Sequence, residues 1–526
     1  MSQTTRVQPF AVGPSLPAPS TLPCRVVLNK RSLCTSLLLV FNLAVMPLKA
    51  YVSESFPWHD RSDVWDYVAN CSASHELCHA GWATYFAARQ PAFGVAFGED
   101  FDVIQENITI APGVRNISEA PLVHLTYAAF QTSAQRAYVL AVLANRAPLA
   151  NFTFISTGRL LGVPTSYSVS WGENTTDVSC IWIGFHTPTY TTAWLCAKFL
   201  SRCLLTLYIL YCVYAHYYRQ YAVLYSNLEQ FGLPTTQARV YELVLGDPTS
   251  IILLNPWIAT AFVLDFWLST EYVSRAFLRI SQTDNALIFI IACFYLSRTV
   301  WFAYGALSLT SLLLKRLGKE DAFVEVDPSM TAMGVALVAG PFTFLQFRLL
   351  IFIDLYHFLF SCLLNAEQQA RGLEISLAAF VYTMLLGQLP LLFGFGLASW
   401  RRAKRKRAFA SASFNDWKHR FCMWLAMARG TDVVCGGSIY ALFAHRKRCK
   451  KNVCMSQRGA DCFVFYQDDD GRRTSARLSL LRCVDLRHVM SVTQVHSVAV
   501  GTVLNTNESS QGVRITVGAN SCPWLL

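Results

Sequence analysis

Residues 375–400 read ISLAAFVYTMLLGQLPLLFGFGLASW, and RRAKRKR follows directly at 401–407. The first stretch has no charged side chain and, as a helix rising about 1.5 Å per residue, exceeds the ~30 Å hydrocarbon core of a bilayer. Six of the seven residues in the second stretch are basic, and basic loops stay on the cytosolic side of a membrane. Together they predict a membrane-spanning helix that ends in the cytosol.

The composition of the whole chain agrees with a membrane protein. Of its 526 residues, 53% are apolar and only 15% are charged, whereas a soluble globular protein carries about 25% charged residues. The composition therefore argues against a soluble globular protein and excludes a disordered or small disulfide-rich one. Five further apolar runs are expected to be spans: 33–51, 193–215, 251–268, 286–308 and 330–364.

Two of these runs allow more than one interpretation. Residues 33–51 are either a cleaved signal peptide or a signal anchor. The basic, proline-rich arm at 1–32 is expected to be disordered, and its length favours the anchor. The run at 330–364, interrupted by Pro341, is one kinked span, a span plus a membrane-surface helix, or two spans. Because the arm has four basic residues and no acid, both chain ends are expected in the cytosol. An even number of spans is then required, and counting 330–364 once gives six.

The segment at 52–190, between the first two spans, is expected to be a glycosylated extracytoplasmic domain. It holds twelve acidic residues against six arginines and no lysine. Short apolar stretches within it, such as 122–130, suggest an α+β fold. Disulfides between Cys71 and Cys78 and between Cys180 and Cys196 are candidates, although spacing does not fix the pairing. Five of the six N-x-S/T acceptor sites of the chain lie here: Asn70, Asn107, Asn116, Asn151 and Asn174.

The tail at 401–526 is expected to be a small, basic, β-rich cytosolic domain after the five-span region at 191–400. It holds 21 basic residues against 8 acidic ones. The alternating run 462–467, an Asp-Gly turn at 470–471 and the run 476–481 predict a β-hairpin. An amphipathic stretch is expected at 417–427 and further strands at 489–504.

Ionisable side chains inside the expected spans mark a possible polar site, because a charge at the centre of a spanning helix costs about 2.5–3.5 kcal/mol. Asp265 with Arg298, and Asp354 with Arg202, are the expected ion pairs. Lys198 and Arg348 fit side chains that reach the membrane surface. The alternative is a secondary transporter or channel that uses Asp265, Arg298 and Asp354. Arg202 and His357 are the other candidate polar residues within the spans.

The sequence His75-Glu76-Leu77-Cys78-His79 matches H-E-x-x-H, which resembles the zinc metalloprotease signature. On a helix the two histidines would share one face and bind Zn²⁺, with Glu76 as general base and Glu99, Asp100 or Asp102 as third ligand. The extended form of the motif is absent, and a Cys71–Cys78 bridge would compete with it. A membrane-anchored zinc protease is therefore an alternative, and no cofactor is expected outside it.

The sequence as a whole predicts a six-span membrane glycoprotein of the secretory pathway, in the plasma membrane, with a binding, sensing or scaffold role and no assigned catalysis. Its expected partners are the bilayer, anionic inner-leaflet lipid at 401–407, and an unidentified extracellular or cytosolic protein. Nucleic acid is not expected, because the basic run follows a span directly.

Overall fold

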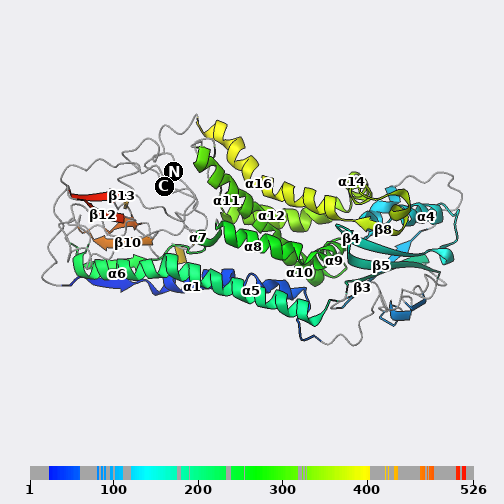
Figure 1. Cartoon of the computed structure of the whole chain (residues 1–526), viewed down its shortest axis with the longest axis horizontal. Coiled ribbons are helices and arrows are strands. Elements are labelled where there is room, and N and C mark those ends of the chain that lie inside the picture. The colour runs from blue at the N-terminus through cyan, green and yellow to red at the C-terminus, as the bar shows by residue number, and fades with distance from the viewer. Residues whose placement is uncertain are drawn as a thin grey trace.

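In the computed structural model the chain is elongated, with a β-sheet at each end and helices between them (Figure 1). We call the six-stranded sheet the large sheet. The five-stranded sheet, which includes one strand from near the start of the chain and three from its C-terminal tail, is called the terminal sheet. The structure describes residues 23–59, 80–81, 84–86, 88–89, 95–98, 101–109, 120–174, 179–188, 190–232, 238–253, 255–282, 284–317, 323, 326, 328–402, 421, 424–425, 432–435, 462–467, 471, 473–478, 505–509 and 512–516.

Four helical stretches within these residues are long and apolar enough to cross a membrane. Their outward surfaces carry large apolar side chains, such as Leu200, Leu204 and Leu207, which are 57–61% exposed. A surface of this kind belongs in lipid, so the protein is membrane-associated. The stretches are Thr192–Gln230 in α5 (Thr192–Val213), η5 (Tyr214–Tyr218) and α6 (Arg219–Phe231); Ala286–Leu314 in α10 (Ala286–Leu296), η6 (Ser297–Thr299) and α11 (Val300–Leu317); Pro328–Gln346; and Ser376–Gly396 in α16 (Ser376–Arg402).

Two expected spans form shorter helices. The run 33–51 becomes α1 (Lys30–Ala44) and a short helix η1 (Leu48–Val52). The run 251–268 becomes α7 (Ser250–Leu253) and α8 (Pro256–Trp267), which Asn255 caps from outside the helix. At 15 and 12 residues, α1 and α8 measure about 22 and 18 Å, less than the hydrocarbon core.

The run at 330–364 is split into two helical pieces. The first, α12 (Pro328–Leu337), η8 (Val338–Phe342) and α13 (Thr343–Gln346), is continuous because the π-type turn η8 accommodates Pro341. The helix is interrupted at residues 347–349, and a second helix, α14 (Leu350–Ser361), follows with 12 residues. The second piece is too short to cross the hydrocarbon core, so the run is one candidate span plus a short apolar helix.

The large sheet lies at one end of the helices (Figure 1) and combines residues from the 52–190 segment with a distant strand. Its helix α4 (Ser133–Leu143) begins with a capping box between Thr132 and Gln135. The last strand, β8, pairs in parallel with β4 and comes from the connection that leads into α16. The strand order is β2 (Val95–Phe97), β3 (Phe101–Ile108), β6 (Ser179–His186), β5 (Val163–Asn174), β4 (Thr153–Leu160) and β8 (Gly372–Glu374).

The terminal sheet lies at the opposite end of the helices (Figure 1). Its order is β1 (Arg25–Leu28), β7 (Val240–Val244), β10 (Cys462–Gln467), β11 (Arg473–Leu478) and β9 (Asp432–Cys435). The predicted tail hairpin is confirmed, since β10 and β11 pair antiparallel with Cys462 opposite Leu478. The expectation of a wholly disordered arm at 1–32 is wrong for residues 25–28, because Val26 and its neighbours pair in parallel with β7.

A separate two-stranded sheet, β12 (Asn505–Ser509) and β13 (Gly512–Thr516), follows in the tail. The strands expected at 489–504 and the basic residues at 403–407 lie outside the described residues. Of the amphipathic stretch expected at 417–427, the structure describes only residues 421, 424 and 425.

Candidate functional site

The expected intramembrane charges are brought together only in part. Asp265, on α8, is ion-paired with Arg298, on η6, as the sequence predicts. Arg202, on α5, pairs with Glu54 and Asp265, whereas Asp354, on α14, pairs with Arg136 of α4. The expected Arg202–Asp354 pair is therefore wrong, because each side chain has another partner. His357, also on α14, is half-buried.

A buried group of six charged side chains, which we call the central cluster, occupies the middle of the helices. Glu54 accepts from Arg202 through both of its oxygens, at 2.7 and 2.9 Å. The same carboxylate lies 3.3 Å from Lys198 Nζ and accepts from Arg298 at 3.1 Å. The cluster is Glu54, Lys198, Arg202, Asp265, Glu271 and Arg298.

The charges of the central cluster balance, with three carboxylates against three cations. Arg202 also donates to Asp265 at 2.8 Å and to the Ser269 hydroxyl at 2.9 Å, and Tyr295 donates to Glu54 at 2.7 Å. An unpaired charge in an apolar interior costs several kcal/mol, and the pairing offsets that cost. The cluster therefore fixes how the segment after η1 packs against α5, α8, α9 (Thr270–Ile280) and α10.

Lys198 corrects a second expectation. Its ammonium is 4% exposed and lies 3.2 Å from Glu271, so the side chain does not reach the membrane surface. Glu271 belongs to α9 (Thr270–Ile280), a helix in which nearly every residue is buried. Because residues four apart share a helix face, Glu271, Arg275 and Arg279 form one charged stripe along α9.

The rest of this stripe binds the large sheet. The carboxylate of Asp102, on β3, is completely buried and accepts from Arg275 at 3.0 Å and from Arg279 at 2.7 Å. Both arginines also donate to the carbonyl of Gly98. A side chain at Gly98 would collide with the Phe101 ring unless that ring shifted. We call Asp102, Arg275 and Arg279 the clamp.

Further polar contacts join the large-sheet region to the helices. Arg348, at the break before α14, donates to the carbonyls of Val123, His124 and Ser281 at 3.0–3.2 Å. These carbonyl bonds engage its guanidinium, and the expectation that Arg348 reaches the membrane surface stays a prediction. The ion pair between Arg136 and Asp354 and the pairing of β4 with β8 connect the same two parts.

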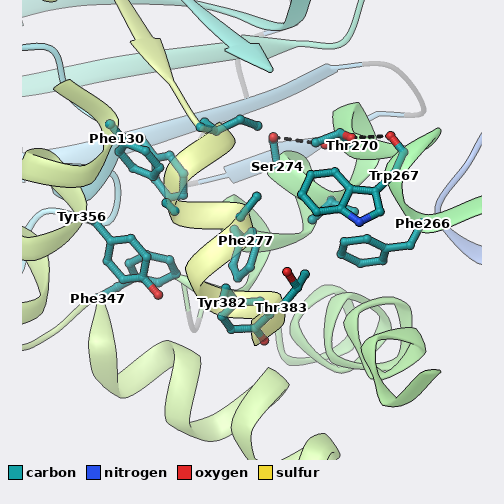
Figure 2. A pocket seen from close by; sticks show the side chains of 15 residues that line it. Phe130, Phe266, Trp267, Thr270, Ser274, Phe277, Phe347, Tyr356, Tyr382 and Thr383 are labelled. Carbon is teal, nitrogen blue, oxygen red and sulfur yellow. Dashed lines mark hydrogen bonds between the residues drawn. The ribbon is translucent and has the colours of Figure 1, made fainter. Parts of the chain in front are cut away.

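An apolar pocket lies where Phe130 of the large-sheet region meets the helices. Figure 2 shows the rings of Phe277, Tyr356 and Tyr382 around it. Its volume is about 40 Å³, room for about three water molecules, whereas ligand pockets measure about 300–1,000 Å³. The volume therefore identifies it as a packing gap between the two parts.

The predicted zinc site is largely outside the described residues. His75, Glu76, His79, Glu99 and Asp100 are not among them. Asp102, the remaining candidate ligand, has both carboxylate oxygens engaged by arginines. Among the residues that the structure describes, no three His, Cys, Asp or Glu side chains gather as a metal site.

The structure describes two of the four candidate disulfide cysteines and three of the five candidate glycosylation sites. Cys180 and Cys196 are both free, one buried at the start of β6 and the other exposed on α5. Because both thiols are free, the expected Cys180–Cys196 bridge is not formed. Asn107, Asn151 and Asn174 are exposed, and Cys71, Cys78, Asn70 and Asn116 lie outside the described residues.

Sequence reasoning missed Glu54, Glu271 and the two arginines of the clamp. Residues 269–285 fall between two apolar runs, so they were expected only to connect spans. The available signal was the four-residue spacing of Glu271, Arg275 and Arg279, which predicts one charged helix face.

Comparison of the chain with protein-family models, with curated proteins and with solved structures finds no match.

Proposed function

We propose that this protein is a multi-pass membrane glycoprotein that binds or senses a partner through its large-sheet region and transmits the event through its helices. The observation that carries the proposal is the clamp. A fully buried carboxylate of the large sheet is held by the same helix, α9, that places Glu271 in the central cluster. The large-sheet region is thereby held to the helices by buried ion pairs.

The strand pairing supports an even number of crossings. The terminal sheet joins β1, which precedes α1, to β7, which follows α6, and to strands that follow α16. The large sheet joins strands between η1 and α5 to β8, before α16. This alternation supports six passages between the two ends, although α1 and α8 are short.

We further propose the orientation of these ends. The basic residues at 401–407 favour the cytosol for the terminal sheet, and the exposed acceptors Asn107, Asn151 and Asn174 favour the extracytoplasmic side for the large sheet. We propose the plasma membrane as the location, anionic inner-leaflet lipid as the partner of residues 401–407, and a protein partner for the large-sheet region. Transport is not proposed, because Asp265 and Arg298 lie in a closed cluster and Asp354 pairs elsewhere.

A continuous set of contacts supports transmission. From the clamp, α9 leads through Glu271 to Lys198 on α5. The helix continues from α5 through η5 into α6, where the Glu229 carbonyl accepts from the Cys24 amide beside β1 at 2.8 Å. Transmission requires energetic coupling along this route, from the clamp to the terminal sheet.

Hydrogen exchange on the full chain in lipid nanodiscs measures that coupling. In the Asp102→Asn variant, which leaves two buried arginines without their carboxylate, we expect faster amide exchange in β3 and α9 and also in β7 and β10. The matched control is Asp354→Asn, which breaks the other ion pair but does not touch the central cluster. We expect its effects to stay in α4 and α14. Changes confined to β3 and α9 in Asp102→Asn would contradict transmission.

A further inference from the structure

A second, larger pocket lies at the edge of the large sheet, beside β4 and β8. Its volume is about 360 Å³, within the range of ligand sites. The residues that line it include two arginines, Arg159 and Arg371, and two amides, Asn365 and Gln368. We call it the arginine pocket. It is separate from the clamp and from the apolar gap.

The arginine pocket presents hydrogen-bond donors without acceptors of their own. The Nε of Arg159 is buried and has no hydrogen-bond partner, and neither arginine forms an ion pair with a described residue. Asn365 and Gln368 form the capping box of α15 (Ala366–Arg371), in which each side-chain oxygen accepts from the other residue's backbone N–H. Their amide NH₂ groups remain available as donors.

This donor set matches an oxyanion. Guanidinium groups bind phosphate or carboxylate oxygens in a bidentate geometry, and amide NH₂ groups add neutral donors. The wall also contains the carboxylate of Glu367, so its charged side chains, two arginines and one glutamate, sum to +1. A metal cation would lack a ligand set here.

The position of the pocket points to a lipid as the source of the oxyanion. Leu364, in its wall, follows α14, whose Phe358 is 60% exposed, and α16, a candidate span, begins just after β8 at Ser376. The β4–β5 turn beside Arg159 carries Leu161, which is 82% exposed. The backbone N–H of Leu161 donates to the Ser376 hydroxyl at 2.8 Å. An exposed leucine beside the first turn of a span is suited to the membrane interface.

We propose that the arginine pocket binds the phosphate group of an anionic phospholipid in the leaflet that borders the large sheet, opposite the leaflet that residues 401–407 contact, with Arg159 and Arg371 as its ligands. The inference does not depend on transmission through α9, because none of its residues belongs to the clamp or the central cluster. Phosphate is the shared chemistry of a lipid headgroup and a soluble phosphate ester, so the experiment separates the two sources.

The test is binding of tail-labelled phosphatidylglycerol to the full chain in phosphatidylcholine nanodiscs, with sn-glycerol 3-phosphate as the soluble competitor. Arg159→Gln and Arg371→Gln are each expected to weaken lipid binding about tenfold, the usual effect of losing a hydrogen bond to a charged group. Arg159→Lys keeps the charge and is expected to restore part of the affinity. The control is Arg146→Gln, at an exposed arginine of the same region outside the pocket, which is expected to leave binding unchanged.

Thermal unfolding of each variant shows whether it is folded, and the Lys variant keeps the test decisive if Arg159→Gln is not. Binding that depends on both arginines and resists the soluble competitor supports the proposal. Equal binding of glycerol phosphate alone overturns the lipid source. Equal affinity of wild type and both folded Gln variants overturns the site itself. Neither result would change the expected outcome of the hydrogen-exchange experiment with Asp102→Asn, which tests transmission and not lipid binding.

Discussion

At the scale of single residues, one carboxylate organises the centre of the molecule. Glu54 contacts Lys198, Arg202 and Arg298 and lies in a short segment between η1 and the large-sheet region. Sequence reasoning identified Arg202, Asp265 and Arg298 because they stand out within apolar runs. It did not identify Glu54, which follows the first apolar run in an ordinary polar context. Nothing in a single sequence indicates which distant charge satisfies a given arginine.

Loss of Arg202 tests the central cluster. Arg202→Gln leaves Glu54 with fewer cations in a buried site, and breaking a buried ion pair costs about 3–5 kcal/mol. We expect a clear drop in the temperature of unfolding in detergent micelles. Glu54→Gln combined with Arg202→Gln is expected to cost less than the sum of the two single changes, because the residues are coupled. Arg219→Gln, at an exposed position on α6, is the control and should have almost no effect. Additive single costs would contradict the cluster.

Glu106, on β3, gives the large-sheet region a pH dependence. Burial raises its pKa above the ordinary value of 4.5, although the Thr126 N–H donates to it at 2.7 Å and opposes the rise. A raised pKa in the folded state means that the protonated form is preferred there. Stability from this residue is therefore greatest at low pH and falls as pH rises from 4.5 through the raised value. We expect Glu106→Gln, which keeps the acceptor for Thr126, to remove this fall and to unfold at a higher temperature at neutral pH. A fall of the same size in the variant would contradict this assignment.

At the scale of elements, hydropathy predicted the long helices well and the short ones poorly. The runs 286–308 and 375–400 appear as α10 with α11 and as α16, because a long apolar run has only the helix as a stable form in lipid. The run 330–364 is split at 347–349, where Arg348 donates to carbonyls of the large-sheet region. Tertiary contacts of this kind cannot be predicted from hydrophobic periodicity. The same is true of the burial of both faces of α9.

The β4–β5 hairpin carries a strained turn. Leu161 and Gly162 connect the strands with φ of +52° and +80°, a type I′ turn that favours Asn-Gly. An L-residue such as leucine in this conformation costs about 1–2 kcal/mol. The carboxylate of Glu374 accepts from both backbone N–H groups, at 2.8 and 3.0 Å, and so holds the turn.

Leu161→Asn is therefore expected to stabilise the hairpin by about 1 kcal/mol, since asparagine tolerates positive φ. Slower amide exchange in β4 and β5 in detergent micelles would show the gain. Val163→Thr, at an exposed strand position beside the turn, controls for loss of apolar surface. Exchange that is unchanged or faster in Leu161→Asn would show that the turn is not strained as described.

At the scale of the whole molecule, the two sheets collect segments that are far apart in the chain. Charge distribution alone placed the arm and the tail on one side. The parallel pairing of β1 with β7 and the antiparallel pairing of β7 with β10 join those segments in one sheet. The sequence contained the tail hairpin as a local turn signal. It contained no signal for β1 or β8, whose three or four residues are strands only because a partner edge is present.

The most direct test of the account is the position of the two sheets relative to the membrane. The chain supplies its own control, since Asn107, Asn151 and Asn174 lie on the large sheet or beside it, whereas Asn507 lies on β12 of the tail. We expect the full chain, made in a eukaryotic secretory system, to lose mass on glycosidase treatment. The shift should shrink stepwise with Asn107→Gln, Asn151→Gln and Asn174→Gln and remain unchanged with Asn507→Gln. Absence of any shift, or a shift lost only with Asn507→Gln, would contradict the proposed orientation.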